Sequence, residues 1–210
     1  MSRQHATKGE RTRARILDAA SELFALSGFN AVSLREIAAH AGMTHAGLLH
    51  HYPGKEALLL EVLARRDRED AAHLFPGMLQ PGEAVPPAVQ LRRIVDLAER
   101  NSRTPGLVGL YTLVAAEAAT PGHPAHDYFV ARYRVLRREI AALLRTVFAE
   151  AAPPVTADPD VVAQQLLALM DGLQTQWALE PDAVPMRRRV VDFLAAHGLR
   201  LDIEDGPVTG

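Results

Sequence analysis

The stretch that decides the fold is residues 33–52, SLREIAAHAGMTHAGLLHHY. It opens with the pattern of a capping box, in which the Ser33 hydroxyl and a Glu carboxylate three residues later bind the first free amides of a helix. A short helix is therefore predicted from Ser33 to about His40. Gly42 can adopt the left-handed backbone conformation that a tight turn needs, and Thr44 can cap a second short helix.

The spacing of Ala38, Gly42 and Leu48 favours a helix-turn-helix. The small Ala38 lets the two helices cross closely, and Leu48 holds the second helix on the core. The opposite face of that helix then stays free, as it must for a helix that enters the major groove of DNA. The same spacing also fits an ordinary pair of helices, so the flanking sequence has to decide between the two.

Helices are also predicted along the rest of the chain. Apolar residues at helical spacing mark residues 12–27, and a longer helix begins at residue 55. Residues 76–87 are rich in Pro and Gly, which is typical of a linker. Prolines punctuate further predicted helices at about 88–102, 106–119, 125–150, 159–179 and 185–197. About nine helices and no convincing strand predict an all-α fold.

The composition is that of a globular protein with an uneven distribution of charge. Hydrophobic residues make up 48% of the 210 residues, and the absence of cysteine excludes disulfides and thiolate ligands or nucleophiles. Residues 1–55 hold seven Lys or Arg against four Asp or Glu, a balance of +3, whereas the remainder carries −5. A basic end on an acidic body suits a head that binds a polyanion.

Several other classes of function find little support. The longest apolar run, residues 107–116, is far shorter than the roughly 20 residues of a membrane-spanning helix. The N-terminus lacks an apolar signal region. We therefore expect a cytoplasmic protein without membrane contact. The histidines at 40, 45, 50 and 51 fall on different helix faces, so we expect no metal and no cofactor. No Ser/His/Asp arrangement supports an enzyme.

The sequence around the two short helices resembles the DNA-binding segment of the TetR family. The resemblance covers about residues 10–65 and rests on Phe24, on Gly28-Phe29, and on the runs VSLREIA (32–38), AGMT (41–44) and GLLHHYPGKE (47–56). It implies a three-helix helix-turn-helix domain at residues 8–54, followed at 55–200 by a helical bundle that binds an effector and dimerises. It also implies that a homodimer binds a double-stranded DNA operator.

The resemblance further implies which residues lie at the DNA. Ser33 and Arg35 would lie near a phosphate, because a hydroxyl and helix N-terminal amides suit an anion. Leu49 departs from the family, which usually has a phosphate-binding tyrosine at this position, and His51 is equally well explained as a structural residue. Tyr52 replaces a more usual Phe and preserves the core aromatic. The implied DNA-binding residues are Ser33, Arg35, Thr44, His45, Ala46, Gly47, Leu49, His50, His51 and Lys55.

Two apolar stripes near the C-terminus are candidates for a dimer interface. Their residues repeat in steps of three and four, as one face of a helix does, and the family resemblance assigns the partner surface to the last two long helices. Two-fold symmetry requires such a surface, although part of each stripe also suits a core. The residues are Leu169, Leu173, Trp177, Val190, Phe193 and Leu194.

Polar groups within the apolar middle helices are candidates for an effector pocket. A ligand cavity needs a few such groups among apolar walls, although exposure on a helix surface explains most of them equally well. The apolar members favour a largely hydrophobic small molecule of unknown identity. The candidates are Leu107, Leu110, Tyr111, Val114, Phe129, Tyr133, Asp171 and Gln174.

The function expected from these observations is that of an effector-responsive transcriptional repressor. A ligand in the body would shift the spacing of the two DNA-binding heads and release the operator. One alternative is a DNA-binding regulator without a small-molecule effector. The other is an all-helical enzyme, which would need a convergent set of catalytic groups.

Overall fold

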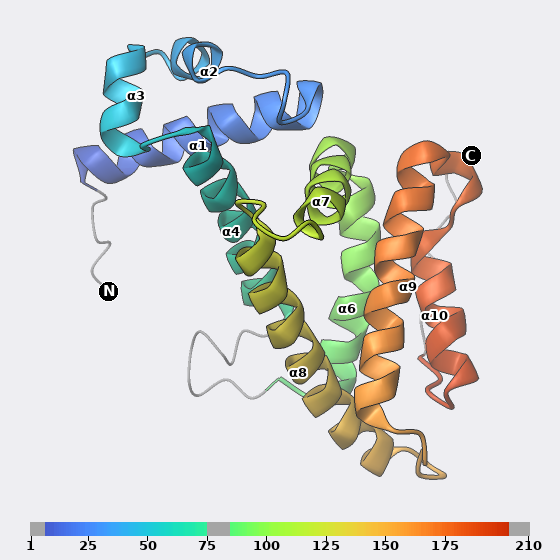
Figure 1. Cartoon of the computed structure of the whole chain (residues 1–210). Helices are drawn as coiled ribbons and strands as arrows, with labels where there is room; N and C mark the ends of the chain where they lie inside the picture. Colours follow the sequence, from blue (N-terminus) through green and yellow to red (C-terminus); the bar gives the residue numbers. More distant parts are fainter. Residues whose placement is uncertain (1–6, 75–84, 202–210) are drawn as a thin grey trace. The chain divides into compact units, whose positions relative to one another are not determined.

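A computed structural model describes residues 7–74 and 85–201 (Figure 1). Within these ranges there are nine α-helices, one 3-10 turn and no strand, which confirms the predicted all-α fold. None of the described helices is long and apolar enough to cross a membrane. Most of the predicted linker at 76–87 lies outside the described residues. The helices are α1 (Lys8–Ser27), α2 (Leu34–His40), α3 (His45–His51), α4 (Lys55–Leu74), α6 (Pro87–Ser102), α7 (Pro105–Ala118), α8 (His126–Glu150), α9 (Pro159–Leu179), the 3-10 turn η1 (Pro181–Ala183) and α10 (Met186–Ala196).

The first helix begins at Lys8, four residues before the start predicted at Thr12. Thr7 and Glu10 form a capping box there: the Thr7 Oγ1 accepts from the Glu10 amide at 3.2 Å, and the Glu10 carboxylate accepts from the Thr7 amide at 2.6 Å. The prediction followed apolar periodicity, which starts later. The cap extends the helix through a polar segment that has no buried face.

Residue contacts divide the chain into two compact units. The first contains the described residues up to 71 together with 104–131. The second contains 72–74, 85–103 and 132–201. The sequence predicts a different division, by function, into a DNA-binding domain at 8–54 and an effector-binding and dimerisation domain at 55–200. The two compact units do not test that division, which stays a prediction.

The core of the first unit is formed by one face of each of its helices. Ile16 and Phe24 of α1, Ile37 of α2 and Leu48 of α3 are at most 1% exposed. Each such side chain contributes roughly 1.5–3 kcal/mol by leaving water. Because α2 and α3 are only seven residues long, they depend on this packing for stability.

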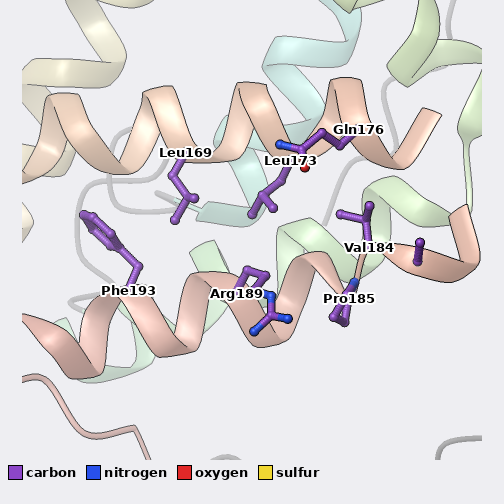
Figure 2. A pocket seen from close by; sticks show the side chains of 8 residues that line it. Leu169, Leu173, Gln176, Val184, Pro185, Arg189 and Phe193 are labelled. Carbon is purple, nitrogen blue, oxygen red and sulfur yellow. The ribbon is translucent and has the colours of Figure 1, made fainter. Parts of the chain in front are cut away.

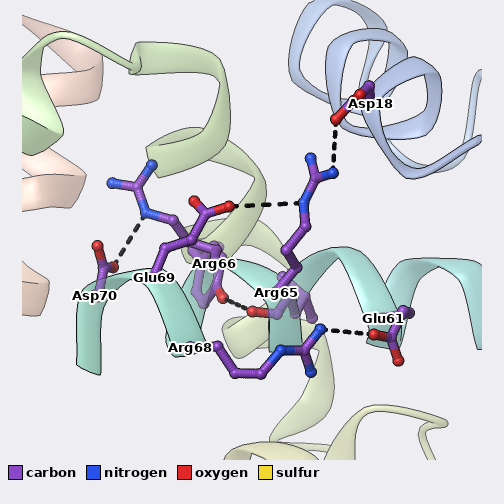
Figure 3. Close-up of polar contacts among 9 residues, drawn as sticks. Asp18, Glu61, Arg65, Arg66, Arg68, Glu69 and Asp70 are labelled. Atoms are coloured by element: carbon purple, nitrogen blue, oxygen red, sulfur yellow. Dashed lines mark hydrogen bonds and ion pairs between the residues drawn. The ribbon is translucent and has the colours of Figure 1, made fainter. Parts of the chain in front are cut away.

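Among the contacts that join α1 to other helices of the first unit, two are made with α7 and α4. Gly106 of α7 approaches α1 so closely that an added Cβ would lie 2.4 Å from the Ala25 carbonyl oxygen. Arg65 of α4 donates to Asp18 of α1 at 2.6 Å, as Figure 3 shows. A partly exposed ion pair of this kind contributes at most about 1 kcal/mol, and the close approach at Gly106 leaves no room for a larger side chain between α7 and α1.

The second unit is built around α10, which packs against both α6 and α9 (Figure 1). Val190 and Leu194 of α10 and Leu166 of α9 have no exposed surface. At the edge of this core, the Arg187 Nε of α10 lies 3.5 Å from an Asp96 carboxylate oxygen of α6. The apolar stripe predicted on α10 is therefore at least partly core.

Candidate nucleic-acid interface

The turn between α2 and α3 has the predicted geometry. Gly42 lies in it with φ +64°, in the left-handed region that glycine tolerates best. The Gly42 amide donates to the Ala39 carbonyl at 3.0 Å and the Met43 amide donates to the Ala38 carbonyl at 2.9 Å, which closes the end of α2. Ala38 is buried. The prediction of a tight turn at Gly42 is confirmed.

Both short helices begin at side-chain caps. The Ser33 Oγ accepts from the Glu36 amide at 3.2 Å, and a Glu36 oxygen accepts from the Ser33 amide at 2.7 Å. These contacts with the Ser33 side chain and backbone hold the pKa of Glu36 below its usual range. At α3 the Thr44 Oγ1 accepts from the Gly47 amide at 3.1 Å. The Thr44 hydroxyl hydrogen therefore remains available to donate to a phosphate or a base.

The side of α3 that lies away from Leu48 faces solvent. Leu48 is completely buried, whereas the side chains around the rest of this helix are exposed or half-buried. None of the ten implied DNA-binding residues lies in the core. Six are exposed (Ser33, Arg35, Thr44, Ala46, Leu49 and His50), and four are half-buried (His45, Gly47, His51 and Lys55).

Leu49 is a large apolar side chain that is 39% exposed on this face. It has no donor for a phosphate oxygen. An apolar side chain on a helix in the major groove can instead contact a thymine methyl group. The exposed Leu49 side chain therefore cannot make the phosphate contact expected of the usual tyrosine, and its role at DNA stays a prediction.

Lys55, at the start of α4, contacts the loop between α1 and α2. Its Nζ lies 4.5 Å from the centroid of the Phe29 ring and donates to the Asn30 carbonyl at 3.3 Å. These contacts join α4 to the loop between α1 and α2. An ammonium group has three donors, so Lys55 retains hydrogen-bonding capacity for a phosphate.

Arg13 is an additional candidate that the sequence analysis did not select. Its guanidinium carbon lies 5.2 Å from the centroid of the Tyr52 ring, a separation typical of a cation–π contact. Tyr52 is the C-cap of α3 and is 4% exposed, as expected of a core aromatic. The charge count indicated a basic segment, but only the fold shows that Arg13 lies beside the end of α3.

The histidines of this region do not form a metal site. The His40 Nε2 lies 2.8 Å from a Glu22 carboxylate oxygen and joins α2 to α1. The rings of His50 and His51 meet edge to face with centroids 5.5 Å apart. Across residues 7–74 and 85–201, no group of three or more His, Asp or Glu side chains could hold a metal ion.

Five of the predicted pocket residues lie in the first unit. Leu110, Val114 and Phe129 are buried, and Leu107 is half-buried. The fifth, Tyr111, meets Phe129 edge to face with ring centroids 6.2 Å apart. Four of these residues come from α7 and Phe129 comes from α8.

Tyr111 also belongs to a polar cluster that joins α4, α7 and α8. Its hydroxyl donates to the Leu63 carbonyl at 2.5 Å and lies 3.3 Å from an Asp67 oxygen. The Tyr128 hydroxyl donates to the other Asp67 oxygen. Sequence reasoning did not select Asp67 or Tyr128, because neither has an unusual position in the helical pattern. The contacts of Asp67 with Tyr111 and Tyr128 span 44 and 61 residues.

The other three predicted pocket residues lie in the second unit. The Tyr133 hydroxyl of α8 donates to Asp171 Oδ2 of α9 at 2.6 Å. Burial raises the pKa of Asp171, and burial and the neighbouring carboxylate both raise the pKa of Tyr133. Gln174, nearly one turn further along α9, is half-buried.

The predicted dimer residues divide into a buried set and an accessible set. Val190 and Leu194 have no exposed surface in the single chain, and Trp177 is 8% exposed, so these three belong to the core of the second unit. Leu169, Leu173 and Phe193 instead line a groove of about 400 Å³ between α9 and α10. Figure 2 shows them directed into the space between the two helices.

The chain has a helix-turn-helix with an exposed second helix, joined to a larger helical body. Residues 16–62 match the family of bacterial regulatory proteins described as the tetR family, and residues 109–199 match the C-terminal region of BetI-type transcriptional repressors. The chain belongs to the TetR family. This family consists of transcriptional regulators, which confirms the predictions of the family and of a non-enzymatic protein.

Individual proteins that are similar to this TetR-family chain are also transcriptional regulators. The regulator SrpR of Pseudomonas putida is 42% identical over 66 residues, 31% of either chain. The matched segment spans between about a third and a half of the length of the curated relatives. A transcriptional regulator from Saccharomonospora viridis in complex with choline is 26% identical, with a TM-score of 0.72 over 88% of this chain and 96% of that one. The TetR-family regulator SCO4454 from Streptomyces coelicolor is also 26% identical, with a TM-score of 0.72 over 90% and 96%.

Proposed function

We propose that this protein is a ligand-responsive transcriptional repressor that binds a palindromic DNA operator as a homodimer. The observation that carries the DNA-binding part is the exposed face of α3, held by Leu48 and by the Thr44 cap. Such a helix enters the major groove with its N-terminal residues at the base edges. The repressor role is supported by the match of the body to BetI-type repressors. We also propose that the protein acts in the cytoplasm, where a bacterial regulator of this family meets its DNA.

The test of DNA binding is selection from random DNA. The purified full-length chain should enrich an inverted repeat whose half-sites lie about one helical turn apart, since each subunit presents one α3. The affinity should fall steeply with rising salt as phosphate contacts release counterions. Enrichment of no inverted repeat would contradict this proposal.

The dimer is supported by the surface of α9. Between Asp160 and Glu180 the only charged residue of this helix is Asp171, so the exposed positions carry no charge. Among them Val161 is 50% exposed and Leu179 is 82% exposed. The cores of protein–protein interfaces are depleted of charged residues. The groove lined by Leu169, Leu173 and Phe193 continues this surface to α10.

Ligand response is supported by the matched solved structures and by the polar groups of the body. One relative of similar fold binds choline, which supports a small-molecule site in this chain as well. In the first unit α7 contacts α1 at Gly106 and donates from Tyr111 to α4. Since α1 and α4 flank the helix-turn-helix in the chain, a ligand that displaced α7 would act on both.

Reciprocity provides the test of this response. A compound that lowers operator affinity must itself bind more weakly when the operator is present, by the same factor. Calorimetry with and without operator measures that factor. Equal ligand affinity in the two titrations would remove the proposed response but leave the DNA-binding proposal intact.

A further inference from the structure

Asp171 is an acidic group in an apolar part of the second unit. It lies in the middle of α9, and the neighbouring Leu166, Leu167 and Met170 are all buried. Its carboxylate is half-buried and accepts one hydrogen bond, from the Tyr133 hydroxyl at 2.6 Å. Removing a carboxylate from water is costly unless other groups compensate its charge.

No basic side chain among the described residues forms an ion pair with Asp171. Arg132 is the cation that acts on it most directly, but its guanidinium lies over the Tyr133 ring, 5.7 Å from the centroid. Its charge lowers the pKa of Asp171 less than burial raises it. The negative charge of the Asp171 carboxylate is therefore only partly compensated by its neighbours. Ionisable groups in such an environment are more common at functional sites than elsewhere in a protein.

The orientation of Asp171 separates it from the groove lined by Leu169 and Leu173. Leu169 and Leu173 line the groove toward α10, and Asp171 is two residues from each. Two residues correspond to about 200° around a helix, so Asp171 lies on nearly the opposite side, where Tyr133 of α8 meets it. Gln174 lies three residues further on, nearly above Asp171, and is half-buried.

We propose that Asp171 binds the positively charged group of an organic-cation effector, with Tyr133 as the residue that positions the carboxylate. Tyr133 occupies Oδ2, so Oδ1 is the acceptor for an N–H of the ligand, and Gln174 offers a neighbouring amide. The inference rests on the proposed ligand response and specifies its chemistry. A cation compensates the charge of the site, a neutral molecule does not, and an anion is repelled.

Three probes with one tail and different head groups test the charge requirement. Octylammonium, octanol and octanoate are each titrated into the full-length dimer by calorimetry. We expect octylammonium to bind about tenfold or more tightly than octanol, because its head group forms a charge-assisted hydrogen bond, and octanoate to bind most weakly. Failure of octylammonium to bind better than octanol would overturn the proposal.

Substitutions locate the charge requirement at Asp171. Asp171→Asn keeps the shape of the side chain and should reduce the octylammonium preference to about one. Glu150→Gln removes one charge from an exposed position of α8 and should leave the preference unchanged. Tyr133→Phe should weaken octylammonium binding and reduce the preference without abolishing it, since the carboxylate remains but is no longer held by the Tyr133 hydroxyl. An Asp171→Asn protein with wild-type melting behaviour and an undiminished preference would contradict the assignment.

Operator binding distinguishes this inference from the proposed function. If octylammonium binds through Asp171 without changing operator affinity, the cation site stands and the proposed response through it fails. If octylammonium releases the operator as effectively from the Asp171→Asn protein as from the wild type, the response stands and the cation site fails.

Discussion

The DNA-binding head and the α9–α10 surface are both made of short apolar patterns on helices, yet their sequences are informative to very different degrees. In the head, Ser33, Gly42 and Thr44 each act on residues within four positions along the chain. On α9 and α10, the stripe from Leu169 to Leu194 looks uniform in sequence but contains both completely buried and accessible residues. Local signals therefore specify the head, whereas only packing assigns roles to the body.

The largest expected effect is that of Phe193→Asp on the dimer. Phe193 is half-buried in the single chain, so an aspartate there can reach water in a monomer. In a dimer it would be buried without a partner, twice per complex, at a cost of several kcal/mol. We expect folded monomers by sedimentation at concentrations where the wild type is dimeric. Ala149→Asp, at an exposed position of α8, is the control. A stable Phe193→Asp dimer would show that the accessible groove is not the interface.

The second effect concerns a contact that the sequence did not indicate. Gly106→Ala places a Cβ 2.4 Å from the Ala25 carbonyl oxygen, so α1 and α7 must separate. Overpacking of this kind costs roughly 1–3 kcal/mol, which urea denaturation measures. Gly109→Ala on the same helix meets nothing within 4 Å and should leave stability unchanged or raise it. Equal free energies of unfolding for Gly106→Ala and Gly109→Ala would show that the close approach of α7 to α1 at Gly106 does not affect the stability of the first unit.

The third effect separates two residues of the head. Lys55→Ala should weaken binding to all DNA sequences alike, about tenfold, because a phosphate contact and the contacts with Phe29 and Asn30 are lost. It should also reduce the salt dependence by about one counterion. His45→Ala should change the preferred base at one position of each half-site instead. Repeating the DNA selection with both variants measures the difference. A changed base preference for Lys55→Ala would reverse the two roles.

The smallest effect concerns the capping box of α2 and its dependence on pH. The pKa of Glu36 is lowered in the folded chain, so its contribution to stability is fully present above its ordinary pKa of 4.5. This contribution is lost as the pH falls through the lowered value. Glu36→Ala should therefore be less stable than wild type at neutral pH, and the difference should disappear in acid. Thermal melts across this range measure it, with Glu56→Ala, at an exposed position of α4, as control. A difference that persists in acid would exclude the carboxylate as its source.

The sequence by itself determined the all-α fold, the two short helices, the turn at Gly42 and the caps at Ser33 and Thr44. Each depends on backbone geometry or on hydrogen bonds within one turn of a helix, so the residues that specify it are neighbours in the chain. The start of α1 was placed too late for a related reason, because its polar first turn is held by the Thr7 cap and not by a buried face.

The tertiary structure alone decided which apolar residues are core and which polar residues meet. Tyr133 and Asp171 are 38 residues apart, and Tyr128 and Asp67 are 61 apart. Val190 and Phe193 are three apart on one helix, yet one has no exposed surface and the other lines a groove. Helical periodicity identifies an apolar face but not its partner, because that depends on which helices pack together across the chain.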